Sequence, residues 1–334
     1  MIHHSEDYFF STFLDTIRMS DRILLFCHTA PDGDTLGSAL ALQLALQKIH
    51  IEADIVCADA VPPMYTFMKN AEKILRHHEV ESTSYQLYIA LDASEPYRLG
   101  ILEGIFSQGS PTCLIDHHLA GFPFAALNVV NSQACATGIL VYKLIRELNI
   151  QMDADIAAHL FIAISTDTGN FSLDNTNAEA FAVATELMAY PFNLASICRL
   201  LYKQYSSEQL KLQACAFKSL KIYQNGIAGM TLRLKDFEKT AARPDQTEAI
   251  IGYGIGLIGI NAAFLAMETT DKRIKFSFRG KPPVDVAEVA VNLGGGGHKL
   301  AAGCIIDGPM AHAVNQVIAL LSKQVTLCNY ERVH

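Results

Sequence analysis

The sequence predicts an α/β protein, with a doubly wound parallel sheet in an N-terminal domain and a smaller α+β domain after it. Three observations predict this fold. The 334 residues exceed the roughly 100–200 of a typical domain, so two domains are expected. Short apolar runs alternate with helix-length segments in the first half, as in a parallel sheet covered by helices. The second half has further strand-like runs without that regular alternation.

Five apolar runs of strand length predict the parallel sheet. They are RILLFCH (22–28), IEADIVC (51–57), QLYIALD (86–92), TCLIDH (112–117) and ALNVV (126–130). Helix-length segments lie between and after them, at residues 36–48, 137–148, 153–165 and 177–188. Strands that alternate with helices favour parallel pairing, because each crossover returns the chain to the same edge of the sheet.

The second domain is expected after a linker helix near residues 194–222, which is rich in Lys, Gln and Leu. The expected domain boundaries are 1–190, 191–225 for the linker, and 226–334. Beyond the linker lie the strand-like runs GMTLRL, NAAFLAMET, RIKFSFR and GCIID and a final helix near 311–324. This mixture is typical of an α+β domain.

The charge is distributed unevenly along the chain. Half of the residues are apolar and 18% are charged, which excludes a disordered chain. Residues 1–190 carry 9 Lys and Arg against 23 Asp and Glu, whereas residues 191–334 carry 17 against 11. We therefore expect metals on the acidic side and a polyanionic substrate on the basic side, with chance surface composition as the alternative. A net charge of −8 does not favour sequence-independent binding of long nucleic acids.

The cysteines and the N-terminus predict a cytoplasmic protein. The eight cysteines form no CxxC pair and lie mostly in apolar runs, so we expect buried free thiols in place of disulfides or a thiolate zinc site. The start MIHHSEDYFF lacks the features of a signal peptide. Residues 249–267 carry no charge and approach the length of a membrane span, but glycines interrupt them. We interpret them as a broken segment followed by a buried strand.

Polar groups gather at the ends of the predicted strands. HTAPDGD (28–34) follows the first strand, on a turn that Pro-Asp-Gly favours. Asp92 follows the third strand, Asp116-His117-His118 follow the fourth, and Asp167 ends an apolar helix. In an open parallel sheet, ligands bind beyond the carboxyl ends of the strands, where these groups would converge. Four separate stretches therefore predict one site.

Each stretch also has an ordinary structural interpretation. Pro-Asp-Gly-Asp is common in turns, and Asp92 could cap a following helix. A pair of histidines is a weak signal, and we assign His77-His78, which lacks a carboxylate partner, to the surface. IDHH differs because its polar groups directly follow the apolar CLI, where an isolated charge would be costly. Taken together, the four stretches favour a functional site.

Of the side chains in these stretches, two imidazoles and four carboxylates are expected to serve as metal ligands, and no cysteine is among them. This oxygen and nitrogen set suits Mn²⁺, with Mg²⁺, Co²⁺ or Zn²⁺ as alternatives. Six ligand side chains exceed what one catalytic ion needs. They suffice for two ions about 3.5–4 Å apart that share carboxylates and activate water for in-line attack on phosphorus. The predicted reaction is hydrolysis of a phosphoester or phosphoanhydride.

The motifs HTAPDGD, LDAS, IDHH and STDTGNF resemble the four motifs of the DHH phosphoesterase superfamily. GGGGHKLAAG (294–303) resembles the signature of the DHHA1 domain that accompanies it. These five motifs span nearly the whole chain in the family's order. The resemblance implies that one ion is held by His28, Asp32 and Asp92, and the other by Asp34, Asp92, His117 and Asp167.

The resemblance also implies roles in catalysis and substrate binding. The expected catalytic residues are Asp92, which would bridge the ions, His118, which would face the substrate phosphate or leaving group, and Asp116, which would orient the histidines. The residues expected to contact the substrate are Arg98, Arg279, Gly295, Gly296, Gly297 and His298.

The glycine run 294–297 can adopt backbone angles closed to other residues, so its N–H groups could converge on an anion beside His298 and Lys299. A flexible loop is the alternative. In the family this loop helps to hold the phosphate or nucleotide of the substrate. Arg279, in KFSFRG, resembles a Ser-x-Arg-Ser segment of the family and would be a second phosphate clamp.

Two positions depart from the family pattern. Gly280 replaces the serine of the Ser-x-Arg-Ser segment, which weakens any inference about the substrate oxygen that is bound. Ala30 replaces an asparagine that is common in the first motif, and we interpret this change as peripheral.

The architecture narrows the choice within the superfamily. Manganese pyrophosphatases carry a different C-terminal domain, RecJ-like exonucleases add an OB-fold domain, and sensor-linked cyclic-dinucleotide phosphodiesterases add an N-terminal extension. The resemblance implies a metal-dependent hydrolase of short oligonucleotides (nanoRNA), of 3′-phosphoadenosine 5′-phosphate (pAp), or of both. A cyclic-dinucleotide or pApA phosphodiesterase and an exopolyphosphatase are the alternatives, and a non-catalytic nucleotide sensor is the alternative of another class. We expect no long nucleic acid and no membrane as partners, and the sequence is compatible with a homodimer.

Overall fold

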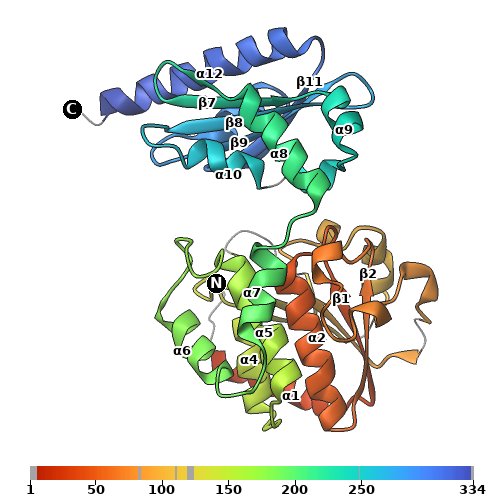
Figure 1. Cartoon of the computed structure of the whole chain (residues 1–334). Coiled ribbons are helices and arrows are strands. Elements are labelled where there is room, and N and C mark those ends of the chain that lie inside the picture. The colour runs from red at the N-terminus through yellow and green to blue at the C-terminus, as the bar shows by residue number, and fades with distance from the viewer. Residues whose placement is uncertain (1–5, 82–83, 110, 119–123, 248, 332–334) are drawn as a thin grey trace. The chain divides into compact units, whose positions relative to one another are not determined.

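The computed structural model describes residues 6–81, 84–109, 111–118, 124–247 and 249–331. The chain divides into two compact units, Met1–Gln204 and Tyr205–His334. Each unit contains one β-sheet with helices packed on it (Figure 1). The predicted α/β fold is confirmed, with a parallel sheet in the N-terminal unit and a mixed sheet in the C-terminal unit.

Five parallel strands form the sheet of the N-terminal unit, in the order β2-β1-β3-β4-β5. Each lies within one residue of its predicted ends. Because β1 has β2 on one side and β3 on the other, the winding of the chain reverses between β1 and β3, which is where open α/β sheets bind ligands. The strands are β1 (Arg22–Cys27), β2 (Glu52–Cys57), β3 (Leu87–Leu91), β4 (Thr112–Asp116) and β5 (Leu127–Val130).

Helices cover both faces of this sheet. Alternate residues of β1 enter two separate cores: Leu25 packs with the long helices, and Phe26 packs with Leu99 and Phe106 on the opposite face. The four predicted helices correspond to α2, α4, α5 and α6. The α-helices are α1 (Glu6–Arg18), α2 (Gly33–Lys48), α3 (Glu103–Phe106), α4 (Thr137–Glu147), α5 (Ala154–Asp167), α6 (Ala178–Leu187) and α7 (Leu194–Tyr202). The 3-10 helices are η1 (Pro63–Tyr65), η2 (Ala71–Lys73), η3 (His77–Glu79) and η5 (Pro96–Leu102).

The expected linker helix is interrupted. It consists of α7, which ends at Tyr202, and α8 (Ser207–Ser219). The Ser206 hydroxyl accepts a hydrogen bond from the Gln209 amide at 3.1 Å, so a new N-cap starts α8. The composition of the segment predicts helix on both sides of this break but does not reveal the cap.

The C-terminal unit has a six-stranded sheet in the order β10-β11-β9-β8-β7-β6. Only β7 and β8 pair in parallel, as expected for a mixed α+β sheet. The strands are β6 (Lys221–Tyr223), β7 (Ile227–Leu232), β8 (Ala262–Glu268), β9 (Ile274–Gly280), β10 (Gly296–His298) and β11 (Ala301–Ile306). The helices are α8, α9 (Leu234–Thr240), α10 (Ile250–Ile255), α11 (Val286–Asn292) and α12 (Met310–Glu331), with the 3-10 helix η6 (Pro244–Thr247).

Two cores flank the C-terminal sheet. Phe264 and Phe276 pack against α11 and α12, whereas Leu265 packs with residues of α8 and α10 on the other face. Figure 1 shows α12 on the face of the sheet opposite α8 and α10. The uncharged segment 249–267 is the short helix α10 followed by strand β8, which confirms the expected broken segment and buried strand.

No helix in the described part of the chain has both the length and the apolar character needed to cross a membrane. The seven cysteines whose side chains are described are free thiols. Five of them are buried, and Cys198 and Cys215 are half-buried. The expectation of isolated, mostly buried thiols therefore holds for these residues, and Cys328 lies outside the described side chains.

Candidate metal centre

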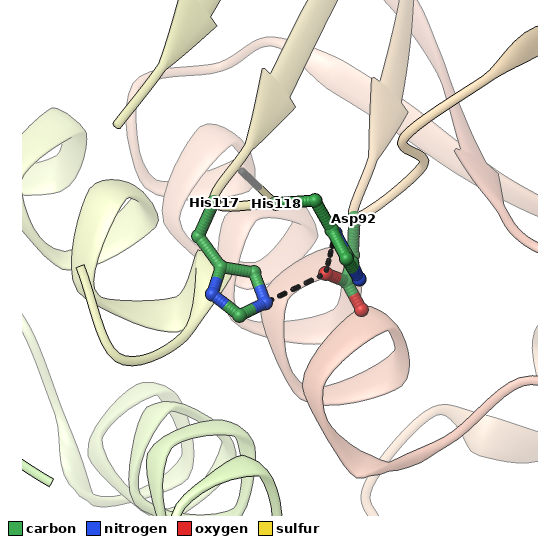
Figure 2. A group of neighbouring side chains, drawn as sticks. All are labelled: Asp92, His117 and His118. Atoms are coloured by element: carbon green, nitrogen blue, oxygen red, sulfur yellow. Dashed lines mark ion pairs between the residues drawn. The ribbon is translucent and has the colours of Figure 1, made fainter. Parts of the chain in front are cut away.

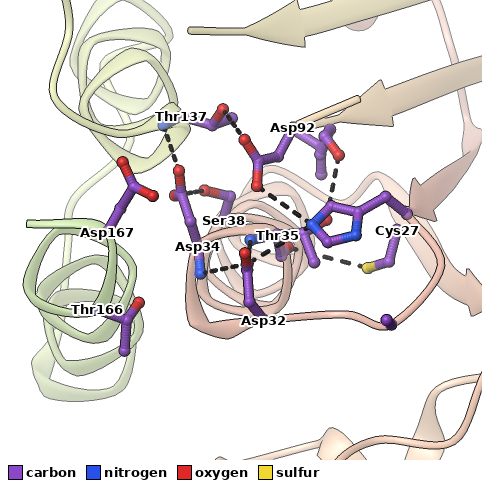
Figure 3. Close-up of polar contacts among 12 residues, drawn as sticks. Cys27, Asp32, Asp34, Thr35, Ser38, Asp92, Thr137, Thr166 and Asp167 are labelled. Atoms are coloured by element: carbon purple, nitrogen blue, oxygen red, sulfur yellow. Dashed lines mark hydrogen bonds and ion pairs between the residues drawn. The ribbon is translucent and has the colours of Figure 1, made fainter. Parts of the chain in front are cut away.

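The predicted site lies at the carboxyl edge of the N-terminal sheet. His28 follows β1, Asp92 follows β3, and Asp116 is the last residue of β4. Because parallel strands end at one edge, the three strand ends deliver these groups side by side. Asp167 reaches the same edge as the last residue of α5. Figure 3 shows Asp32, Asp34, Asp92 and Asp167 extending toward a common centre.

The first motif forms the start of α2. The Asp32 carboxylate accepts hydrogen bonds from the Asp34 amide at 3.0 Å and the Thr35 amide at 3.1 Å, which makes Asp32 the N-cap. This cap explains why α2 begins at Gly33, before the predicted residue 36. A side chain at Gly33 would clash with Thr166 of α5, so this glycine allows the two helices to approach. The close packing brings Asp34 toward Asp167.

Asp34 is buried, with 1% of its surface exposed. Its carboxylate accepts hydrogen bonds from the Thr137 amide at 2.6 Å, the Gly138 amide at 2.9 Å and the Ser38 hydroxyl at 3.1 Å. The two amides belong to the first turn of α4, whose N-terminus stabilises a negative charge. Burial, together with the charges of Asp92 and Asp167, raises the pKa of Asp34 well above its ordinary value.

Two imidazoles are oriented in the same way. The Nδ1 atom of His28 lies 2.7 Å from the Thr29 carbonyl oxygen, and that of His117 lies 3.2 Å from the Ala134 carbonyl oxygen. An Nδ1–H that donates to a carbonyl leaves Nε2 with a free lone pair. In both rings Nε2 points toward carboxylates, so both side chains have the direction of metal ligands.

Asp92 lies between these imidazoles. Its Oδ2 is 3.4 Å from Nε2 of His28, and its Oδ1 is 3.5 Å from Nε2 of His117. Its backbone is left-handed, with φ at 61°, which is uncommon for a residue other than glycine. The Thr137 hydroxyl donates to Oδ1 at 3.0 Å. One carboxylate therefore faces two imidazoles, as a bridging ligand requires.

Asp167 completes the cluster on the side of His117, with Oδ2 3.6 Å from Nε2 of that ring. The side-chain nitrogen Nδ2 of Asn175 donates to the same oxygen at 3.1 Å. Burial, together with the charges of Asp92 and Asp32, raises the pKa of Asp167 to about 6, although His117 opposes the shift. The carboxylates thus repel one another where they are closest.

His118 is oriented differently from the other two imidazoles. Its Nδ1 lies 2.7 Å from Oδ1 of Asp116, and its side chain is 39% exposed. The hydrogen bond to Asp116, aided by the charge of Asp92, raises the pKa of His118 despite burial. Figure 2 shows ion pairs from both His117 and His118 to the same oxygen of the Asp92 carboxylate. Asp116 occupies Nδ1 of His118, so the other ring nitrogen is the one that does not contact Asp116.

Arg98 lies beside His28. Its Nη2 is 3.2 Å from Nδ1 of that ring, and its carbonyl oxygen accepts a hydrogen bond from the Thr29 amide at 2.7 Å. The structure therefore places this predicted substrate residue against the edge of the cluster. His77 and His78 are exposed and contact each other in η3, as expected for a surface pair.

The predicted substrate residues of the C-terminal unit lie on adjacent strands. Ala301 of β11 pairs with Arg279 of β9 on one side and with His298 of β10 on the other. Directly paired residues of antiparallel strands point to the same face, so Arg279 and His298 share one face of the sheet. Gly280 has little room for a side chain, because a Cβ would lie 3.1 Å from Val286.

Two of the four amides of the glycine run are bonded within the protein and are not available to an anion, whereas anion binding at Gly296 and Gly297 stays a prediction. The Gly294 amide donates to the Val291 carbonyl at 3.0 Å, and the Gly295 amide donates to the Ala290 carbonyl at 2.8 Å. A side chain at Gly295 or Gly297 would clash with β11. These glycines close the end of α11 and permit tight pairing of β10 with β11, and Gly296 and Gly297 are exposed within that hairpin.

The cluster fits divalent cations. Three groups in the described part of the chain have ligand atoms close enough to share an ion: His28 with Asp32 and Asp92, Asp34 with His117 and Asp167, and Asp92 with His117 and His118. The buried Nε2 of His28 has no hydrogen-bond partner, although two carboxylates face it at 3.4 and 3.6 Å. A cation would satisfy this nitrogen and offset the carboxylate repulsion. When bound, such ions activate water at neutral pH and stabilise charge on phosphoryl oxygens.

The residues that support the ligands were not predicted as site residues. Thr137 and Gly138 start a predicted helix, and Ser38 and Asn175 lie in ordinary helical and loop sequence. The only sequence signal was the small polar start of the helix at residue 137, which marks a helix N-terminus but not the carboxylate it binds.

Two family models match the chain. The DHH family N-terminal domain matches residues 22–164, and the DHHA1 domain matches residues 227–326. The bifunctional oligoribonuclease and PAP phosphatase NrnA of Thermus thermophilus is 31% identical over 313 residues, which cover 92% of this chain and 91% of that protein. NrnA of Bacillus subtilis is 27% identical over 318 residues, covering 94% and 96%. An exopolyphosphatase-related protein from Bacteroides fragilis has the same fold, with a TM-score of 0.90 at 23% identity, covering 97% of this chain and 98% of the other.

The fold, the buried ligand cluster and the full-length similarity to NrnA proteins define a hydrolase of phosphoester bonds. The chain belongs to the DHH family of phosphoesterases, in the form that carries a DHHA1 domain.

Proposed function

We propose that this enzyme hydrolyses short oligoribonucleotides to mononucleotides and removes a phosphate from pAp, using two divalent cations. The observation that carries this proposal is the position of Asp92 between two imidazoles, at 3.4 and 3.5 Å. One carboxylate shared by two ligand groups is the arrangement that two-metal phosphoryl transfer requires. The substrate class is supported by the names of the NrnA relatives, which match along nearly their whole length.

In this proposal six side chains hold the ions. The donors are imidazole nitrogens and carboxylate oxygens without sulfur, a set that suits Mn²⁺. Asp92 faces an imidazole of each ligand group, so it would be shared by the two ions. The ligands are His28, Asp32 and Asp92 for one ion, and Asp34, Asp92, His117 and Asp167 for the other.

His118 and Asp116 act on the substrate side of the cluster. Asp116 holds Nδ1 of His118, so the ring keeps a fixed direction. The hydrogen bond to Asp116 also raises the pKa of His118, which favours the protonated ring. The exposed nitrogen can donate a proton to a phosphate oxygen or to the leaving oxygen. Asp116 therefore acts through His118 and does not itself contact the substrate.

Arg98, Arg279 and His298 bind the charged parts of the substrate in this proposal. Arg279 and His298 share a sheet face, and the glycines beside them leave the backbone accessible to a phosphate. Guanidinium groups bind phosphate by paired hydrogen bonds, which favours Arg279 as the stronger contact. We also propose a cytoplasmic location, since the described cysteines are free thiols.

The test is hydrolysis by the full-length protein with Mn²⁺. The substrates are pAp, a ribodinucleotide, pApA, a cyclic dinucleotide, a 24-mer RNA, pyrophosphate and polyphosphate. We expect turnover of pAp and the dinucleotide and little turnover of the 24-mer. Preference for the 24-mer, polyphosphate or the cyclic dinucleotide would overturn the substrate assignment. Binding of nucleotides without any turnover would indicate a sensor.

A matched pair of histidine variants locates the activity. His117→Ala removes a proposed ligand, so turnover should fall by about two orders of magnitude or more. His77→Ala changes a histidine of the other His-His pair, which is exposed and contacts its neighbour His78. Turnover should be unchanged in that control. Equal activity of the two variants would refute the site.

A further inference from the structure

Thr137 touches two of the proposed ligands at once. It is the first residue of α4, and none of its surface is exposed. Its hydroxyl donates to Oδ1 of Asp92 at 3.0 Å, and its amide donates to Oδ2 of Asp34 at 2.6 Å. Figure 3 shows Thr137 above both carboxylates, with a hydrogen bond to each.

Asp92 needs an external restraint. The terminal torsion of an aspartate is broad, so the backbone alone does not set the plane of its carboxylate. The backbone of Asp92 is left-handed, so the bond from Cα to the side chain has a direction that is uncommon for residues other than glycine. Among the described residues, Thr137 provides the one hydrogen bond that this carboxylate accepts. The imidazoles that face the carboxylate lie at 3.4 Å or more, which is too long for hydrogen bonds of defined direction.

The hydroxyl distinguishes the two carboxylate oxygens. It binds Oδ1, the oxygen that faces His117, and leaves Oδ2 directed at His28. A rotation of the carboxylate by a quarter turn would direct neither oxygen at its imidazole. The same residue fixes Asp34 through its amide, so α4 supports both carboxylates from one position.

We propose that Thr137 is a positioning residue, whose hydroxyl holds Asp92 in the plane that lets it bridge two cations. This inference rests on the proposed two-metal function. It assigns to the hydroxyl a task separate from the packing of the side chain, because valine has the same shape without the hydroxyl. Serine keeps the hydroxyl and loses only a methyl group.

The test compares Thr137→Val with Thr137→Ser by Mn²⁺ titration of the full-length protein. Isothermal titration calorimetry gives the number and affinity of the ions, and electron paramagnetic resonance reports whether two Mn²⁺ ions are coupled. Thr137→Val should weaken the binding of at least one ion by about 10–100-fold and remove the coupled spectrum. Thr137→Ser should retain two coupled ions with affinities close to those of the unaltered protein. With pAp as substrate, Thr137→Val should lower kcat with little change in KM.

Thr240→Val is the matched control. The Thr240 hydroxyl is also buried and donates to the Asp236 carbonyl at 2.7 Å, within the C-terminal unit. This variant loses the same chemical group and should bind two Mn²⁺ ions normally. If Thr137→Val does not fold, as judged by circular dichroism, Thr137→Ala and Thr137→Ser provide the same comparison with less steric demand.

Two outcomes would overturn the inference. Normal Mn²⁺ affinity and an unchanged coupled spectrum in Thr137→Val would show that the hydroxyl does not position Asp92. Equal losses in the valine and serine variants would show that packing, and not the hydroxyl, matters. If the unaltered protein binds two ions but cleaves neither pAp nor dinucleotides, the proposed function fails while the ion-binding comparison still decides the role of Thr137.

Discussion

At the carboxyl edge of the N-terminal sheet, Asp34 and Asp92 are at most 2% exposed, whereas Gly296, Gly297 and His298 of the C-terminal unit are exposed. The first region buries negative charge that only hydrogen bonds and a cation can offset. The second region uses its glycines to close a hairpin and leaves polar groups in water. Buried and restrained groups suit chemistry, and exposed groups suit binding of a charged ligand, so the two regions should respond differently to substitution.

The largest expected effect is at Asp92. Asp92→Asn keeps the size of the side chain and removes the charge shared by both ligand groups. We expect kcat for pAp to fall by about 10³-fold or more, equivalent to about 4 kcal/mol. Steady-state kinetics with Mn²⁺ measures this change. Because the substitution also removes one buried negative charge, thermal denaturation without metal should show no loss of stability. Retention of more than a tenth of kcat would contradict the bridging role.

The next largest effect concerns the stability of the N-terminal unit at low pH. His159 of α5 is buried, its Nδ1 has no hydrogen-bond partner, and burial lowers its pKa to about 4. Asp155 and Asp153 oppose this shift, and Lys69 adds to it. In the unfolded chain His159 binds a proton with a pKa near 6.5, whereas in the folded protein it does so only near pH 4. The contribution of the neutral His159 to the free energy of unfolding is therefore present above pH 6.5 and is lost as the pH falls toward 4. This contribution is about 2–3 kcal/mol between pH 7.5 and 4.5.

His159→Leu isolates that contribution from the other titrating groups of the unit. Urea unfolding of both proteins at pH 7.5 and 4.5, followed by circular dichroism, gives the difference. The stability of the unaltered protein relative to the variant should decrease by about 2–3 kcal/mol at the lower pH. No buried histidine is found among the described residues of the C-terminal unit, so that unit should lack this component. A pH dependence unchanged by the substitution would refute the assignment.

A smaller effect is expected at Arg279, which is half-buried and shares a sheet face with the exposed His298. Arg279→Ala should raise KM for pAp about tenfold and leave kcat within about twofold, because a charged hydrogen bond to bound phosphate acts on substrate and transition state alike. The KM of Arg279→Lys for pAp should lie between those of the unaltered protein and Arg279→Ala. Initial-rate kinetics distinguishes this pattern from that of Asp92→Asn. A loss in kcat at constant KM would show that Arg279 acts in the catalytic step and not in substrate binding. The proposed difference between the N-terminal cluster and the C-terminal sheet would then be refuted.

The smallest effect concerns two exposed alanines with left-handed backbones. Ala30 has φ at 49° and lies between His28 and Asp32, and Ala241, with φ at 56°, ends α9 in the C-terminal unit. Asparagine tolerates this conformation better than alanine, so Ala30→Asn and Ala241→Asn should each stabilise the protein by about 0.5–1 kcal/mol in urea unfolding. Only Ala30→Asn should alter Mn²⁺ affinity. If either substitution destabilises the protein, the left-handed backbone at that position does not lower the stability of the unaltered protein.

The strand runs and the convergence of the motifs were predictable from sequence. Apolar runs such as RILLFCH have the length of a strand, and their alternation with helix-length segments favours a parallel sheet. The rule for parallel sheets then places His28, Asp92 and Asp116 at one edge. Ala30 shows the limit of comparing residue types, since the exchange of asparagine for alanine does not reveal that the backbone at this position is left-handed.

Other features depend on contacts that no local pattern contains. The amides of Thr137 and Gly138 bind a carboxylate about a hundred residues earlier in the chain, as the separations of 103 and 104 positions show. The glycine run was predicted to bind an anion because glycine frees the backbone. The structure uses that freedom for close packing against β11, which is an equally good reason for glycine and cannot be distinguished from sequence alone.

The most direct test of the account is a crystal structure grown with Mn²⁺ and measured at the manganese absorption edge. We expect two anomalous peaks within ligand distance of Asp92, one beside His28 and one beside His117. A single peak away from Asp92, or none at the carboxyl edge of the N-terminal sheet, would contradict a two-metal centre in this protein.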